Sequence, residues 1–233
     1  MAEVNTVITY VRGADRQLTA NFKQAEFDCK GSAKTSRCGC KKTLISTKLV
    51  RKLQILRKKA GSAITINSGY RCSIHNFYSG GAGQSFHTKG FAADIRIKGM
   101  TPAKVAKLAE EIGFTGVGMY NGTSGVFTHV DVRPTPYKWK NTRGKNITVS
   151  DHGGTKKKRP YALQMAIIRL GSTGDGVRAI QWVLNWAGYP CTVDGDFGAA
   201  TKAAVIAFQT DMCLTPDGIV GNATRSALSE VSA

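Results

Sequence analysis

The sequence is poor in acidic residues and has no long apolar run. Only 15 aspartates and glutamates stand against 33 lysines and arginines in 233 residues, which gives a net charge of +18. Apolar residues make up 42%, too many for a disordered polar chain, yet no run approaches the roughly 20 residues that cross a bilayer. These observations predict a globular protein that does not insert into a membrane. Its charge predicts affinity for a polyanion such as nucleic acid, anionic lipid or a cell-wall polymer.

Cysteine is present but not in the spacing of a strong metal or redox motif. None of the six cysteines forms a CxxC pair. Cys29, Cys38 and Cys40 lie close enough in sequence to share a structural metal, but buried free thiols are the interpretation that we favour for them.

The first 25 residues also lack the features of a secretory signal peptide. They contain no basic start followed by an apolar core of about 7 to 15 residues. We therefore expect the protein to be made in the cytoplasm without an export signal.

The distribution of charge divides the chain into three parts. Residues 1–137 carry 21 basic and 8 acidic side chains, residues 138–159 carry 8 and 1, and residues 160–233 carry 4 and 6. The middle block is polar, contains glycine and proline, and ends in a run of four basic residues. We predict domains at 1–137 and 165–233, joined by a basic linker at 138–164.

The C-terminal part contains an internal repeat. The segment 194–201 (DGDFGAAT) is echoed 23 residues later by 217–224 (DGIVGNAT). The Asp-Gly pairs suit tight turns, and the apolar spacing after each one is helical. Together with an amphipathic helix before Gly188, this predicts a small domain of three helices. The arrangement closely resembles the peptidoglycan-binding module found beside many cell-wall enzymes, and the resemblance covers residues 165–230.

The N-terminal part mixes helical and strand periodicities. Helices are expected to end near Gly61 and to run from Thr101 to Gly113. Strand-like segments occupy 63–68, 92–97, 117–120 and 126–133. The pattern predicts an α+β domain in which helices flank a small, mostly antiparallel sheet.

Three residues could form a catalytic metal site. Alternation along the last strand places His129 and Asp131 on one face, and the same alternation turns Asp94 away from the apolar side of its own strand. His87 precedes Asp94 by seven residues. Two imidazoles and one carboxylate fill three tetrahedral positions of a zinc ion and leave the fourth for water. Taken singly, each histidine is more often a structural residue.

Several motifs of this region carry a more specific resemblance. The element SxHxxGxAxD is satisfied by residues 85–94, and it is accompanied by the motifs SGYR at 68–71, GVGMY at 116–120 and FTHVD at 127–131. In order and spacing these motifs resemble the M15 family of zinc D-Ala-D-Ala carboxypeptidases and related peptidoglycan peptidases, over residues 18–133. The resemblance implies that the zinc ligands are His87, Asp94 and His129. It also implies that Arg71 and Ser85 line the substrate subsite.

One departure from that family concerns the catalytic base. Many relatives place a carboxylate three residues before the last histidine, where this chain has Val126. Asp131, on the same strand face as His129, is our candidate for the base; the alternative is that it bonds a ligand imidazole or pairs with Arg133. Arg71 would polarise the scissile carbonyl or clasp a substrate carboxylate.

Two hydroxyl groups complete the candidate site. Ser85 would donate a hydrogen bond to the substrate or close a turn. Tyr120 could reach the site from its strand, or simply pack against its neighbours.

These observations predict a zinc peptidase of bacterial peptidoglycan, of the phage endolysin type, with no obligate protein partner. Two alternatives stay open: a zinc-containing wall-binding protein without catalysis, and a nucleic-acid-binding protein suggested by charge alone. Within the enzyme class, a D,D-carboxypeptidase is the alternative to an endopeptidase. An endolysin must weaken the wall network, which favours the endopeptidase.

Overall fold

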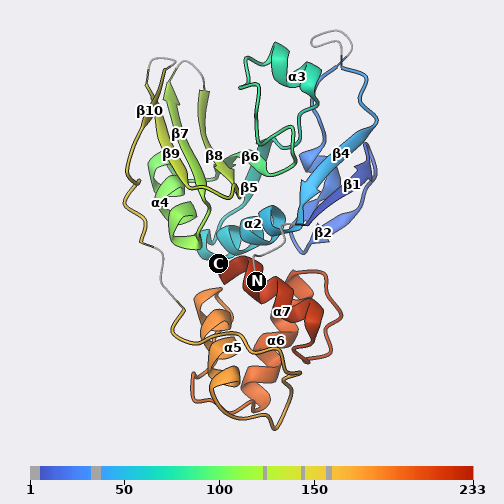
Figure 1. Cartoon of the computed structure of the whole chain (residues 1–233), viewed down its shortest axis with the longest axis vertical. Coiled ribbons are helices and arrows are strands. Elements are labelled where there is room, and N and C mark those ends of the chain that lie inside the picture. Colours follow the sequence, from blue (N-terminus) through green and yellow to red (C-terminus); the bar gives the residue numbers. More distant parts are fainter. Residues whose placement is uncertain (1–5, 33–37, 123–124, 143–144, 156–158, 233) are drawn as a thin grey trace.

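The computed structural model describes residues 6–32, 38–122, 125–142, 145–155 and 159–232. It consists of a larger N-terminal part with sheets and helices and a smaller C-terminal part of three helices (Figure 1). The predicted fold class is therefore confirmed. Among the described residues, none of the helices combines the length and apolar character that crossing a bilayer requires.

A six-stranded sheet forms the centre of the N-terminal part. Its strands lie in the order β10-β9-β7-β8-β6-β5, and all neighbours are antiparallel except β7 and β9, which are parallel. The strand bounds are Ile64–Ser68 for β5, Ala92–Ile97 for β6, Gly116–Gly122 for β7, Gly125–Asp131 for β8, Tyr137–Thr142 for β9 and Lys145–Thr148 for β10. The four strands expected from alternation are thus β5 to β8.

Strands β9 and β10 correct the predicted domain boundary. Residues 138–148 were expected to belong to a linker, but they form the edge of the sheet. The pairing is made possible by Gly118 of β7, which faces Trp139 of β9; a side chain at position 118 would overlap the indole ring. Trp139 is consequently buried, although lysines flank it on both sides. The basic run 156–158 lies outside the described residues.

Two helices cover the sheet and form the core with it. Helix α2 (Thr47–Ala60) begins where the Ser46 hydroxyl accepts a hydrogen bond from Leu49 N, and it ends at Gly61 in the left-handed conformation. Helix α4 (Pro102–Ile112) is capped in the same way by Thr101 and Gly113. Apolar side chains of both helices pack against those of β5, β6 and β7 in one cluster.

In the view of Figure 1, strands β1, β2 and β4 lie to the right of α2, and α3 lies at the top of the molecule. Strand β1 (Val7–Val11) pairs antiparallel with β4 (Lys42–Ser46), and β2 (Gln17–Thr19) pairs with β3 (Phe22–Lys23). A 3-10 helix, η1 (Gln24–Phe27), and a short helix, α3 (Ser73–Tyr78), complete this side.

The C-terminal part is built on the repeat seen in the sequence. Its helices are α5 (Asp175–Trp186), α6 (Ala199–Asp211) and α7 (Asn222–Ser232). A buried glutamine closes each repeat loop with the same four hydrogen bonds. Gln181 bonds the first loop, at Asp194, Gly195, Asp196 and Thr201. Gln209 bonds the second, at Asp217, Gly218, Ile219 and Thr224.

Helices α2 and α7 join the two parts directly (Figure 1). Arg51 and Glu230 form an ion pair of 2.6 Å that is mostly shielded from solvent. Buried Lys52 donates to Val231 O at 3.3 Å and to Ile112 O at 2.9 Å. A second ion pair links Lys58 with Asp211 at 3.3 Å. The C-terminal part is therefore packed against the N-terminal part, whereas the sequence indicated only a tether.

Candidate metal centre

The sheet brings two of the predicted metal ligands directly opposite each other. Strands β6 and β8 are antiparallel neighbours, and their register pairs Asp94 with His129. His87 comes from the turn before β6. Gly90 in that turn adopts the left-handed conformation, and a side chain at this position would meet the backbone of Leu44. Both observations require glycine there. All three residues are buried.

The three side chains point one donor atom each at a common centre. His87 Nε2 lies 3.1 Å from His129 Nδ1, and Asp94 Oδ1 lies 2.9 Å from His129 Nδ1 and 3.3 Å from His87 Nε2. The other ring nitrogens point outward: His87 Nδ1 donates to Gly69 O at 2.7 Å, and His129 Nε2 donates to Asp131 Oδ2 at 3.0 Å. The outward hydrogen bonds thus direct an unprotonated nitrogen of each neutral ring inward.

This geometry calls for a cation at the centre. Two inward lone pairs and a carboxylate oxygen at these distances repel one another unless a positive charge lies between them. Burial lowers the pKa of His87. Burial also lowers the pKa of His129, but the hydrogen bonds with Asp131 and Asp94 outweigh this and raise it to about 9. Without a metal, a proton on His129 would supply the charge.

The donor set fits a divalent metal. Together the three residues provide two imidazole nitrogens and one carboxylate oxygen, all close enough to reach one ion. Burial by itself would raise the pKa of Asp94, but His87 and His129 hold it well below its usual range, so that the carboxylate is ionised. Two histidines, one carboxylate and a free fourth position are typical of catalytic zinc.

Arg71 contacts the second oxygen of the Asp94 carboxylate. Its Nη2 pairs with Asp94 Oδ2, and its Nε donates to Ser68 Oγ at 2.7 Å. Arg71 therefore contacts the candidate metal site through its ion pair with the ligand Asp94. Its contact with a substrate, inferred from the sequence, stays a prediction.

Asp131 does not have the geometry of a catalytic base. It is fully buried, and it bonds the nitrogen of His129 that faces away from the centre. Arg133 holds the same carboxylate through Nε, at 2.8 and 3.0 Å, and through Nη2. Gly116 makes room for it, since a side chain there would overlap the carboxylate. These contacts favour the alternative considered with the base role, in which Asp131 bonds a ligand imidazole and pairs with Arg133; the base role itself stays a prediction.

The hydroxyl groups of Ser85 and Tyr120 form hydrogen bonds with residues other than the three candidate metal ligands' side chains. The Ser85 hydroxyl accepts a hydrogen bond from His87 N at 3.3 Å, which closes the turn that carries this ligand. The Tyr120 hydroxyl accepts from Trp139 Nε1 at 3.1 Å, and its ring stacks on Phe127. Their contacts with a substrate stay predictions.

Trp139 is the residue of the site that sequence reasoning missed. Its ring lies against His129, with 5.0 Å between the ring centroids. The alternation of Tyr137 and Trp139 with lysines was a signal for a strand, but the basic composition of the segment indicated a linker.

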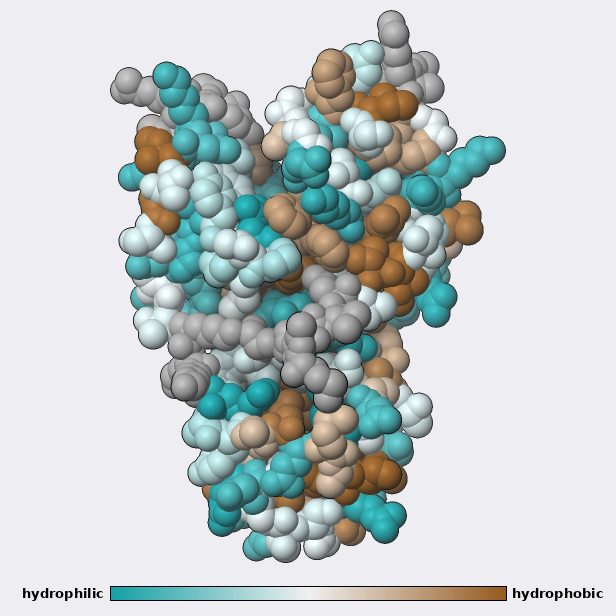
Figure 2. Space-filling model, viewed as in Figure 1, coloured by the Kyte–Doolittle hydropathy of each residue, from teal (hydrophilic) through white to brown (hydrophobic). Residues whose placement is uncertain are grey.

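The surface above this region is hollowed. Figure 2 shows a notch between the lobe that contains β7 to β10 and the lobe that contains α3 and β4, with hydrophilic residues along it. Strand β6, which carries Asp94, lies between these lobes, and β8, which carries His129, forms the edge of the first lobe that is next to β6 (Figure 1).

Comparison with known proteins identifies both parts. Residues 20–131 match the family model Peptidase M15, and residues 173–228 match the model described as "Putative peptidoglycan binding domain". The N-terminal part is therefore similar to Peptidase M15, and the C-terminal part is similar to the peptidoglycan binding domain. Both resemblances noted in the sequence are confirmed over these residues.

Individual relatives match shorter stretches. The chain is 51% identical over 66 residues to the zinc D-Ala-D-Ala carboxypeptidase of Streptomyces albus G, a match that covers 26% of this chain and 25% of the relative. It is 41% identical over 70 residues to an uncharacterized protein of Kitasatospora aureofaciens, which covers 29% of this chain and 59% of that protein. The chain thus spans only part of the length of these curated relatives.

Among solved structures, the SleB N-terminal domain is matched over its whole length by 31% of this chain. The sequence identity is 33% and the TM-score 0.30.

Proposed function

We propose that this protein is a zinc peptidase that hydrolyses an amide bond in the peptide part of bacterial peptidoglycan. The observation that carries the proposal is the convergence of His87 Nε2, Asp94 Oδ1 and His129 Nδ1 within the region that matches Peptidase M15. The second domain supports the choice of substrate, because a wall-binding domain keeps the peptidase close to its polymer.

The residues of the site would divide the work as follows. A zinc ion bound by the three ligands would act as a Lewis acid and lower the pKa of a water molecule to about 7. Asp131 and Arg133 hold His129 in the tautomer that keeps Nδ1 free for the metal. Arg71 holds Asp94 and lies at the edge of the group, where it would attract the carboxylates of a stem peptide. Ser85 and Tyr120 would line the same subsite.

We propose cleavage within the wall network, as an endolysin requires, rather than trimming of terminal D-alanine. Its location is part of the same proposal: synthesis in the cytoplasm of a bacterial host and action on the wall after release. The support is the combination of a peptidase domain with a wall-binding domain. A D,D-carboxypeptidase is the alternative within the enzyme class.

The test is digestion of purified sacculi followed by mass spectrometry of the released muropeptides. We expect new peptide ends with the intact protein, none after treatment with a chelator, and recovery when zinc is restored. His129→Ala is the matched control and should be inactive under all three conditions. New ends at cross-bridges or at the L-Ala-D-Glu bond would support an endopeptidase, whereas loss of one terminal alanine alone would identify a carboxypeptidase.

A second candidate function is wall binding without catalysis. The engagement of Asp131 by His129 and Arg133 favours it, because it removes the carboxylate that we expected to act as base. Intact, zinc-loaded protein that binds sacculi and leaves every muropeptide unchanged would establish this alternative.

A further inference from the structure

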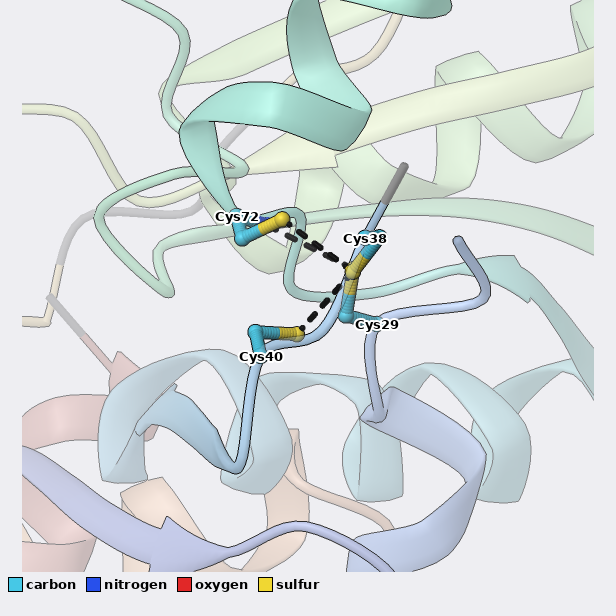
Figure 3. Close-up of side chains that lie close together, drawn as sticks. All are labelled: Cys29, Cys38, Cys40 and Cys72. Atoms are coloured by element: carbon cyan, nitrogen blue, oxygen red, sulfur yellow. Dashed lines mark hydrogen bonds between the residues drawn. The ribbon is translucent and has the colours of Figure 1, made fainter. Parts of the chain in front are cut away.

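Four cysteines from three separate segments meet in one cluster, and one of them, Cys72, directly follows Arg71 in the chain. Cys29 follows η1, Cys38 and Cys40 precede β4, and Cys72 precedes α3. Figure 3 shows their side chains converging from these segments. Their sulfur atoms all lie within 4.8 Å of one another. This cluster combines residues up to 43 positions apart in the chain.

The distances between the sulfur atoms fit one tetrahedral metal ion. Cys38 Sγ lies 3.3 Å from Cys40 Sγ, 3.3 Å from Cys72 Sγ and 3.7 Å from Cys29 Sγ. Four thiolates at about 2.3 Å from a zinc ion would be about 3.8 Å apart. A disulfide would need about 2.05 Å, and all four cysteines are free.

The surroundings of the cluster suit negative sulfur. Arg12 points its Nη1 at Cys40 Sγ (3.7 Å) and at Cys38 Sγ (3.9 Å). Backbone N–H groups also point at sulfur, with Cys72 N at 3.5 Å from Cys29 Sγ and His75 N at 3.4 Å from Cys72 Sγ. Four thiolates around a divalent ion carry a net charge of −2, which a guanidinium and oriented N–H groups stabilise.

We propose that Cys29, Cys38, Cys40 and Cys72 bind a second zinc ion, which is structural and distinct from the one at His87, Asp94 and His129. Four thiolates close the coordination sphere and leave no position for water, the arrangement of structural rather than catalytic zinc. His75 Nδ1, at 3.3 Å from Cys29 Sγ, orients one of the ligands from outside the tetrahedron.

The position of this zinc gives it a defined task. Cys72 directly follows the segment that serves the metal centre: Gly69 O accepts from His87 Nδ1, and Arg71 pairs with Asp94. Tyr70, which lies between Gly69 and Arg71 in the chain, is buried and packs against Cys29 and Cys38. A zinc ion here would cross-link the N-terminal loops to this segment, in place of the disulfide that a reducing cytoplasm disfavours. It would thereby hold Gly69 and Arg71 against their partners.

The zinc content of the full-length protein, purified under reducing conditions, tests the proposal. We expect about two zinc ions per chain by mass spectrometry of the metal. His129→Ala should keep about one, which separates this site from the proposed peptidase centre. Cys72→Ser should also keep about one after dialysis against a mild chelator. Serine at position 72 can still accept the hydrogen bond from His75 N and cap α3, so the variant is expected to fold.

Cys213→Ser is the matched control, because Cys213 is exposed in the C-terminal part. It should keep both ions. A second measurement needs no cysteine variant: an organomercurial added to folded His129→Ala should release the remaining zinc in step with the reaction of four thiols. Cobalt in the same protein should give an intense sulfur-to-metal absorption in the near ultraviolet.

Two results would overturn the proposal. The first is a protein that, refolded with excess zinc, holds one ion and loses it in His129→Ala. The second is a disulfide between cluster cysteines in protein isolated under non-oxidising conditions. Failure of the peptidase assay alone leaves both readouts unchanged, because neither depends on catalysis.

Discussion

Replacing Asp131 by asparagine separates a positioning role from a base role. The variant keeps the volume of the side chain and an oxygen for His129 Nε2, but it loses the negative charge. A charge-assisted hydrogen bond of 3.0 Å becomes a neutral one, and such bonds differ by about 1 to 1.5 kcal/mol. This corresponds to roughly a tenfold weaker hold on zinc, at the lower end of the 10- to 100-fold typical of groups that orient a metal ligand.

Equilibrium dialysis against zinc buffers would measure the affinity, and sacculus hydrolysis at saturating zinc would measure turnover. We expect Asp131→Asn to need about ten times more free zinc at the histidine site and to lose little turnover once that site is full. Both variants break the ion pair between Asp131 and Arg133, but Arg133→Gln keeps the charged hydrogen bond between Asp131 and His129. It therefore controls for general destabilisation. An unchanged zinc requirement combined with a loss of turnover of about a thousandfold would refute the positioning role and restore the base role.

Four further predictions follow from other contacts. Metal-free protein should lose stability as the pH rises from about 6.5 through about 9. The reason is that folding raises the pKa of His129, so the free energy that its protonated form contributes is complete only below the pKa of the unfolded chain. Urea unfolding at several pH values should show this decrease, and His129→Gln should flatten it. Gly118→Ala should cost about 1 to 3 kcal/mol in thermal unfolding by displacing Trp139, whereas Gly122→Ala in the same strand, where the space is open, should cost much less. Gln181→Leu and Gln209→Leu should destabilise the C-terminal part by similar amounts, since each leaves the same kinds of partners without a hydrogen bond, among them a buried glycine N–H and a buried threonine hydroxyl; costs that differ severalfold in chemical denaturation would contradict the equivalence of the two loops. A double-mutant cycle on Arg51 and Glu230 should give a coupling of about 1 kcal/mol or more, and the exposed pair of Lys23 and Asp15 should give a clearly smaller one.

Much of the metal centre could be predicted because its geometry follows from local alternation. Asp94 and His129 lie on neighbouring antiparallel strands, and the two-residue period alone turns both toward one face. The same period placed Asp131 beside His129 correctly. It could not say which ring nitrogen Asp131 would contact, because that depends on the rotation of the His129 imidazole, whose other nitrogen bonds Asp94.

The parts that sequence reasoning missed depend on contacts between distant segments. Strand β9 pairs in parallel with β7, a pairing without a local turn to announce it, and its lysines resemble those of a linker. The cysteine cluster needed Cys72, which lies 32 residues beyond Cys40 and shares no spacing motif with it. In both cases the deciding neighbour is brought in by the fold rather than by the adjacent sequence.

The packing of α7 on α2 bears on how the two domains would work on one polymer. Because Arg51, Lys52 and Lys58 all contact the C-terminal part, the peptidoglycan-binding domain is held in one orientation relative to β6 and β8. A peptidoglycan chain bound by that domain would then present its peptide branches to the metal centre from a single direction and at a fixed distance. If the proposed function holds, only branches whose distance from the point of binding matches the fixed separation of the two parts would reach the metal centre.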